Sequence, residues 1–173
     1  KVVKEDKSDC KINEVGELWL KSPVVTSGYW RNEKATKETT TDGWFHTGDL
    51  VKQDQDGYFY VVDRKKNMYI SGGENVFPAE IESYLYTNEK IKEVAVIGVE
   101  DEKWGEVGKA YIVLKDNQTL NEIEIKEFCL GNLAKYKIPK YVEFLSDLPK
   151  SEAGKIDKKK LIQMHMDTLT NKS

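Results

Sequence analysis

The chain has 173 residues, enough for one ordinary domain or two small ones. Its formal net charge of −3 excludes a general electrostatic attraction to nucleic acid or to an anionic membrane. No apolar run approaches the ~20 residues of a membrane-spanning helix, and the polar N-terminus lacks a signal-peptide core. Cys10 and Cys129 lack metal-ligand spacing, so we expect reduced thiols, no metal site and a cytoplasmic protein.

The N-terminal part predicts mostly β-structure. Residues 17–20 form an apolar strand pattern, and the polar stretch 32–41 is interpreted as a short helix or a loop. A strand that starts at Val51 is expected to break at the turn sequence 54–57 and to return over residues 58–62.

Near residues 63–66 the pattern changes, and strands begin to mix with helices. Pro78 fits the first turn of a helix, with Ile81 and Leu85 on one face. Asn121 precedes a second helix. The apolar stripe of that helix consists of Ile125, Phe128, Cys129 and Leu133. Further strands are expected over 68–70, 94–99, 110–114 and 141–145, and a terminal helix over 157–165. Strict β-α alternation is absent, so the second part predicts an α+β fold.

Two polar features suit contact with a nucleotide. Asp49 follows a glycine turn in Trp-Phe-His-Thr-Gly-Asp, where a carboxylate can accept two hydrogen bonds from a ribose diol. Arg64 starts a run of three basic residues that ends at Lys66, and its guanidinium can bind a ribose or phosphate oxygen. The alternatives are a surface turn capped by Asp49 and a solvated basic turn. Residue types alone favour these alternatives.

Glycine and lysine mark two further candidate positions. Gly72 and Gly73 let a ligand approach the backbone closely, although a plain tight turn explains them equally well. Lys155 follows Gly154, so its ammonium extends from a loop and suits a phosphate or a developing negative charge. The alternative is a solvated surface lysine. The G-x-x-x-x-G-K-[ST] spacing of a phosphate-binding loop is absent.

Aromatic residues and histidines have structural interpretations as well as functional ones. Trp104 either anchors a turn or stacks on a cofactor, and Tyr136 with Lys137 either closes a helix or contacts a nucleotide. His46 has no nearby Ser or Cys with an acid that would indicate a catalytic triad, and His165 is interpreted as a helix-end residue.

Five motifs follow one another along the chain. They are G-E-L-W-L-K-S-P-V-V-T-S-G-Y-W, D-G-W-F-H-T-G-D, D-G-Y-F-Y-V-V-D-R-K-K, I-S-G-G-E-N-V-F-P-A-E-I-E and P-K-S-E-A-G-K-I-D. This succession resembles the adenylate-forming superfamily, and within it the C-terminal third of fatty-acyl- and aryl-CoA ligases. The resemblance implies that residues 1–65 are the β-rich end of the large domain's third subdomain. Residues 66–173 would then be a small mobile α+β domain.

The same resemblance implies roles for residues at the motif positions. Asp49 and Arg64 would bind the nucleotide of ATP or AMP, and Lys66 would be the hinge, where some relatives have aspartate. Lys155 would neutralise the carboxylate and the phosphate during adenylation.

The resemblance also implies contacts with CoA, and some of these positions match the family's motifs more closely than others. Gly72 and Gly73 would line the path of the pantetheine arm. Trp104, Tyr136 and Lys137 would contact CoA by the looser match. Ile138 stands where some relatives place a basic residue.

The implied reaction joins a carboxylic acid, expected to be a fatty acid, to CoA through an acyl-adenylate, with ATP converted to AMP and pyrophosphate. One domain rotation would separate the two half-reactions. Mg²⁺ is expected for the full-length enzyme, with no ligand in this chain. The family's phosphate loop, acyl pocket and central Tyr-Gly-x-Thr-Glu segment are absent from the sequence. We therefore expect the chain alone to be inactive and to need the upstream remainder of the large domain.

Two alternative functions stay open. The first is an adenylation domain that loads a carrier protein, although the S-G-G-E-N-V-F-P-A-E-I-E wording favours CoA ligases. The second is a non-catalytic module that binds a nucleotide or CoA. Lys155 argues against this module, because a pure binder has no need of an adenylation lysine.

Overall fold

A computed structural model describes residues 1–170 of the chain. These residues fall into two compact units, Lys1–Lys66 and a second unit that begins at Asn67. The division lies in a short 3-10 turn, η1 (Lys65–Asn67), one residue from the expected boundary. The hinge role of Lys66 stays a prediction. Within residues 1–170, no helix is both long enough and apolar enough to cross a membrane.

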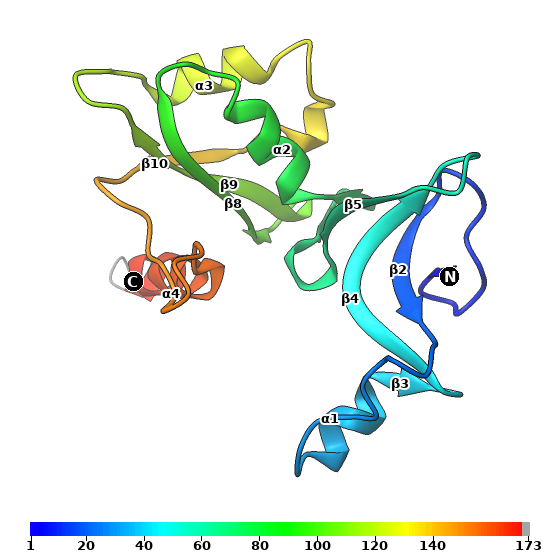
Figure 1. Ribbon diagram of the computed structural model, residues 1–173. Helices are drawn as coiled ribbons and strands as arrows, with labels where there is room; N and C mark the ends of the chain where they lie inside the picture. The colour runs from blue at the N-terminus through cyan, green and yellow to red at the C-terminus, as the bar shows by residue number, and fades with distance from the viewer. Residues whose placement is uncertain (171–173) are drawn as a thin grey trace. The chain divides into compact units, whose positions relative to one another are not determined.

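The first unit is a five-stranded antiparallel sheet with one short helix. Its strands run in the order β1-β2-β4-β3, and β5 also pairs with β4 (Figure 1). The elements are β1 (Val2–Val3), β2 (Val15–Leu20), α1 (Glu33–Glu38), β3 (Thr40–Thr41), β4 (Trp44–Gln53) and β5 (Phe59–Arg64). Helix α1 shows that the polar stretch 32–41 is in part helical, with the Asn32 side chain accepting a hydrogen bond from the Ala35 amide.

Strand β4 corrects one expectation, because it starts at Trp44 and not at Val51. Its first residues pair with β2, and the rings of Trp19 and His46 stack with their centroids 4.0 Å apart. Glycine and aspartate in this stretch suggest a turn, but pairing with two neighbouring strands overrides that local preference. Asp49 therefore lies within a strand and not in a surface turn.

The second unit has an α+β fold on another five-stranded sheet, which confirms the expected fold class. The strand order is β10-β9-β6-β7, and β8 pairs with β9 along its whole length. Among the strand pairs within residues 67–170, only the β9–β10 pair is parallel. The elements are β6 (Tyr69–Ser71), β7 (Glu74–Val76), α2 (Pro78–Leu85), β8 (Ile91–Asp101), β9 (Gly105–Leu114), α3 (Glu122–Cys129), the 3-10 turn η2 (Lys135–Lys137), β10 (Tyr141–Phe144) and α4 (Lys158–Thr170).

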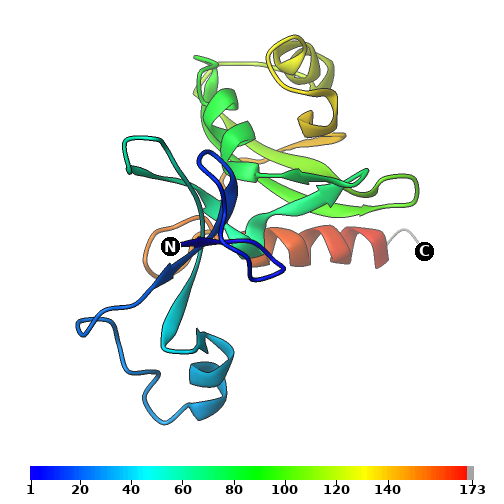
Figure 2. The ribbon, with the colours of Figure 1, turned by 90° about the vertical axis from the view of Figure 1, so that its right-hand side faces the viewer.

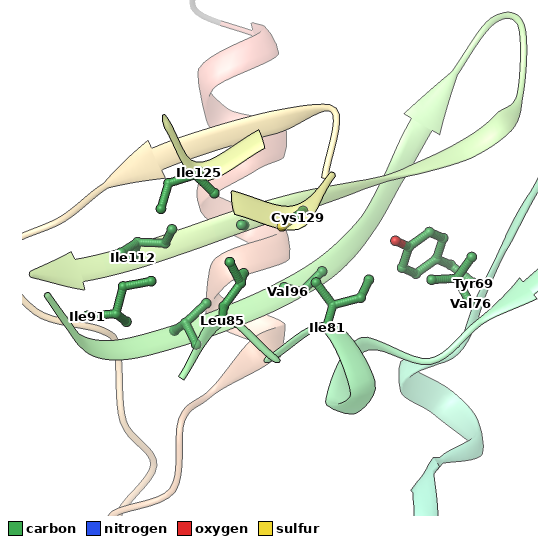
Figure 3. Packing of buried hydrophobic residues seen from close by; sticks show 11 residues of the cluster. Tyr69, Val76, Ile81, Leu85, Ile91, Val96, Ile112, Ile125 and Cys129 are labelled. Carbon is green, nitrogen blue, oxygen red and sulfur yellow. The ribbon is translucent and has the colours of Figure 1, made fainter. Parts of the chain in front are cut away.

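Helices cover both faces of this sheet. Helices α2 and α3 lie on one face and α4 on the other (Figures 1 and 2). Successive residues of a strand point to opposite faces, so Val94 and Val96 of β8 join the core under α2 and α3, whereas Ala95 and Ile97 join the core against α4. The first core also contains Tyr69, Val76, Ile81, Leu85, Ile91, Ala110, Ile112, Ile125 and Cys129 (Figure 3).

Two expected helix features were wrong. Helix α3 ends at Cys129, because Leu130 is extended and Gly131 has a φ of +82°, so Leu133 packs on the core from outside the helix. Helix α4 continues to Thr170, so His165 lies within the helix and not at its end.

Truncation of a core side chain on α2 should unfold the second unit more easily. Leu85 is fully buried, so Leu85→Ala should lower the free energy of unfolding by about 2–5 kcal/mol, measured by denaturant titration. The matched control is Ile123→Ala on α3, where the side chain is exposed and the change should stay within about 0.5 kcal/mol. Equal effects of the two substitutions would contradict the proposed core.

Candidate functional site

The first candidate site lies where β4 and β5 pair in the first unit. Asp49 and Arg64 are opposite each other, and Arg64 Nη1 donates a hydrogen bond of 2.7 Å to Asp49 Oδ1. Both side chains stay accessible, with 31% of Asp49 and 52% of Arg64 exposed. The carboxylate can therefore accept further hydrogen bonds from hydroxyl groups, while the guanidinium keeps other N–H groups for an anion.

Glu17 on β2 belongs to this site and was missed by sequence reasoning. Its carboxylate accepts hydrogen bonds from Lys65 Nζ at 3.0 Å and from the Gly48 amide at 3.1 Å. Burial opposes ionisation of Glu17, but the hydrogen bond and the charge of Lys65, together with smaller contributions from Trp19 and Gly48, outweigh it and lower the pKa of the carboxyl. Lys65 is therefore held by Glu17. The only sequence signal is a carboxylate on an otherwise apolar strand.

A shallow cleft adjoins the Asp49–Arg64 pair. Its volume is about 260 Å³, and its lining residues are Gly48, Arg64, Lys65 and Lys66. Asp49 and Glu17 already pair with Arg64 and Lys65, so Lys66 leaves a net positive charge at this cleft, which favours an anionic ligand such as a phosphate. The structure thus brings Asp49 and Arg64 together at this cleft, and their nucleotide-binding role stays a prediction.

The second candidate site is a cavity of about 460 Å³ in the second unit. Its lining residues are Ser71, Gly72, Glu74, Trp104, Val107, Lys135, Tyr136, Ile138 and Lys140. The backbone of Gly72 lies close to that of Trp104, because the Gly72 amide donates a hydrogen bond of 2.9 Å to the Trp104 carbonyl. A Cβ at Gly72 would lie 2.9 Å from Trp104 Cε3, and the φ of +59° is in the left-handed region. Both facts restrict this position to glycine.

Asp101 holds the tryptophan of this cavity and was not anticipated. Asp101 Oδ1 accepts hydrogen bonds from the amides of Lys103 and Trp104, each at 3.1 Å. Lys140 forms an ion pair with the same carboxyl, and the hydrogen bond from Lys140 lowers the pKa of Asp101. These contacts hold the backbone at Trp104, whose ring lies beside Gly72 although almost half of the residue is exposed.

Not every residue predicted for this site lines the cavity. Gly73 has a φ of +89° but lies outside the lining, and a Cβ at Gly73 would have no atom of residues 1–170 within 4 Å. Lys137 also lies outside it and forms an ion pair with Glu80 at 2.7 Å. Ile138 does line the cavity and packs on the first core, so it supplies an apolar wall. The basic lining residues are Lys135 and Lys140.

The third candidate, Lys155, lies on a tight loop before α4. The Ser151 amide donates to the Lys155 carbonyl at 2.8 Å, and the Gly154 amide donates to the Ser151 carbonyl at 2.8 Å. Gly154 closes this turn with a φ of +75°. The Lys155 residue is exposed, and its ammonium has no ion pair with any residue between 1 and 170. Its charge is available to a ligand.

The family of the chain follows from comparison with known proteins. Residues 80–155 match the AMP-binding enzyme C-terminal domain. The 2-succinylbenzoate–CoA ligase of Listeria monocytogenes serotype 4b (strain F2365) is 46% identical over 158 residues, which cover 91% of this chain and 33% of that protein. The chain belongs to the adenylate-forming acyl- and aryl-CoA ligases and corresponds to their C-terminal part.

The chain is also similar to other members of the adenylate-forming family. The feruloyl-CoA synthase of an Amycolatopsis species is 50% identical over 143 residues, covering 83% of this chain and 29% of that protein. The solved structure of o-succinylbenzoate CoA synthetase from Bacillus subtilis, in complex with its acyl-adenylate intermediate, has a TM-score of 0.86 and 39% identity. The match covers 92% of this chain and 33% of that one. The chain spans about a third of the length of the curated relatives it matches.

Within the second unit, the loop of Lys155 and the cavity of Trp104 lie at opposite ends of strand β8. Lys150, at the base of the loop, pairs with Glu93 near the start of β8, whereas Trp104 follows Asp101 at its end. Asp101 lies eight residue steps along the strand from Glu93, which is roughly 26 Å at about 3.3 Å per residue. In Figure 2 the loop lies at one end of α4 and the β8–β9 turn at the other.

Proposed function

We propose that the chain is the C-terminal part of an ATP-dependent ligase that joins a carboxylic acid to CoA through an acyl-adenylate. The observation that carries the proposal is the arrangement of the second unit. One compact unit presents an unpaired lysine at one end of β8 and a glycine–tryptophan cavity at the other, as far as residues 1–170 show. Adenylation would use the end with Lys155, and thioester formation would use the end with the cavity. The names of the relatives as CoA ligases support this interpretation.

In the first half-reaction, a carboxylate oxygen attacks the α-phosphorus of ATP, and the bond to the β-phosphate breaks to release pyrophosphate. Asp49 would accept hydrogen bonds from the ribose hydroxyls, and Arg64 would bind a nucleotide oxygen. Lys155 would bring its positive charge to the point where two anions meet. A cation that is placed in advance stabilises such a transition state strongly, because no reorganisation is needed at the moment of reaction.

In the second half-reaction, the sulfur of CoA attacks the acyl carbon and loses its proton to water, and AMP leaves with the electron pair of the broken C–O bond. Gly72 would let the pantetheine arm pass close to the backbone, with Trp104 and Tyr136 as the apolar wall. Lys137 and Gly73 stay proposed CoA contacts from outside the lining of the cavity. Lys66 would be the pivot that exchanges the two ends of the unit. The proposal assigns no ligand of Mg²⁺ to this chain.

The acid substrate is proposed from the relatives. Their names refer to succinylbenzoate and ferulate, which are aromatic acids, so an aryl acid is favoured over the fatty acid that the motifs suggested. Free CoA is favoured over a carrier protein for the same reason. We also propose a cytoplasmic location, supported by Cys10 and Cys129, which are both free thiols.

A panel of carboxylic acids, offered with ATP and CoA to the complete enzyme, tests the proposal. We expect acyl-CoA and AMP from aryl acids, in higher yield than from fatty acids. The 173-residue chain alone should form neither adenylate nor thioester, because it spans only a third of the relatives' length. Transfer to a carrier protein but not to CoA would favour the carrier-loading alternative. Nucleotide binding without any turnover of the complete protein would favour the non-catalytic module.

A further inference from the structure

The loop that carries Lys155 spans residues 149–157. We call its two ends legs: the first begins at Pro149 and Lys150, and the second leads through Ile156 and Asp157 into α4. Backbone contacts join the two legs at the base of the loop. Lys150 and Ile156 form an isolated antiparallel bridge, and the Asp157 amide donates to the Pro149 carbonyl at 2.8 Å. Backbone hydrogen bonds of this kind define the shape of the loop. They do not define how the loop is held against the rest of the unit.

The first leg is held by Glu93. Lys150 Nζ lies 2.8 Å from Glu93 Oε1, and the hydrogen bond to Glu93 raises the pKa of Lys150. Glu93 Oε2 is buried, and within residues 1–170 it has no hydrogen-bond partner. The ion pair with Lys150 therefore provides the main compensation for the charge of this carboxylate. Such a carboxylate binds its lysine more tightly than one that water can solvate freely.

The second leg is held by Glu82 of α2. Lys158, the first residue of α4, lies 2.7 Å from Glu82 Oε1, and both side chains are about four-fifths buried. The same oxygen accepts a hydrogen bond of 2.7 Å from the Val96 amide, on the edge of β8 that faces away from β9. Glu82 thus connects the end of the loop, a helix and the sheet edge at one point.

We propose that Glu82 and Glu93 are positioning residues for Lys155. They anchor the two legs of its loop to β8 and α2, and so place the ammonium for the adenylation half-reaction. This inference rests on the proposed function. Lys155 itself has a long side chain and a glycine neighbour, so its position depends on how firmly the loop base is held. A displacement of about 1 Å in a catalytic group can cost on the order of 100-fold in rate.

The test uses Glu93→Gln and Glu82→Gln in the complete ligase. Glutamine keeps the size of each side chain and an oxygen that can accept a hydrogen bond, but it removes the charge that holds the lysine. We expect each substitution to lower the adenylation rate by about tenfold or more, measured as pyrophosphate exchange. Thioester formation from a supplied acyl-adenylate should stay unchanged. The matched control is Glu122→Gln, which removes an exposed ion pair with Lys126 on α3 and should change neither half-reaction.

A double-mutant cycle separates positioning from general destabilisation. In a Lys155→Ala background, Glu93→Gln and Glu82→Gln should cause no further loss of adenylation, because both act through Lys155. Equal losses in both half-reactions, or full losses on top of Lys155→Ala, would overturn the proposal.

Amide hydrogen exchange tests the anchoring without any need for activity. The amides of residues 150–157 should exchange several-fold faster in each variant than in the wild type and in Glu122→Gln. Unchanged exchange and unchanged adenylation would together overturn the anchoring role. If the complete wild-type protein showed no adenylation at all, faster exchange in the variants would support the anchors and overturn the proposed function instead.

Discussion

Replacement of Lys155 by alanine in the complete ligase should lower the adenylation rate by about 10²–10³-fold. The ammonium is exposed, and no partner among residues 1–170 holds it in an ion pair. Its removal therefore disturbs little of the fold. The loss should come from the transition state in which the carboxylate meets the α-phosphate, since no other cation of this loop would be placed there.

Thioester formation is the internal reference for this substitution. A supplied acyl-adenylate should be converted to acyl-CoA at the wild-type rate, because that half-reaction would use the other end of β8. Lys159→Ala provides the matched control, since Lys159 is another exposed lysine four residues further on. Burst measurements of each half-reaction give the two rates separately. An adenylation rate that stayed at the wild-type value would remove Lys155 from the mechanism.

Gly72→Ala should slow thioester formation and leave adenylation intact, which is the reverse of the effect expected for Lys155→Ala. The added Cβ would meet Trp104 Cε3 at 2.9 Å and would also be strained by the φ of +59°. Either the ring of Trp104 moves into the cavity or the backbone retreats from it, and both changes obstruct the path proposed for the pantetheine arm. We expect thioester formation to fall by on the order of 100-fold, with adenylation retained.

Gly131→Ala is the control for backbone strain. Gly131 also has a positive φ, +82°, but a Cβ there would meet no atom of residues 1–170 within 4 Å. Both substitutions should cost a similar free energy of unfolding from strain, about 1 kcal/mol, and only Gly72→Ala should affect thioester formation. If Gly131→Ala slowed that half-reaction as much as Gly72→Ala, the loss would reflect destabilisation and not the path of CoA.

Sequence reasoning reached the fold class because its elements depend on local signals, and residue types alone marked the candidate site positions, whose roles stay predictions. Pro78 marks the start of α2, and the alternation in β8 follows from runs of Val, Ile and Ala. Gly72 and Gly154 were recognised as special from residue type, and both have positive φ. Turn residues before Asp49 misled the prediction, since strand pairing from β2 overrides their preference.

The residues that sequence reasoning missed depend on contacts between distant segments. Glu17 meets Lys65 across 48 positions, and Asp101 meets Lys140 across 39. No pattern in a single segment distinguishes such a glutamate or aspartate from an ordinary surface acid. Their roles are set by strand register and by how the loops fold back, and these are properties of the assembled sheet.

The spacing along β8 also sets a minimum size for the movement in the proposed cycle. If one end of the unit must replace the other beside the same adenylate, the displacement is on the order of 26 Å, far beyond the reach of a side chain. Collective motions of this size take microseconds to milliseconds. The acyl-adenylate, a mixed anhydride that water can hydrolyse, would have to stay shielded from solvent for at least that long. In the proposed cycle, protection of the intermediate during the exchange would thus be a second task of the complete enzyme.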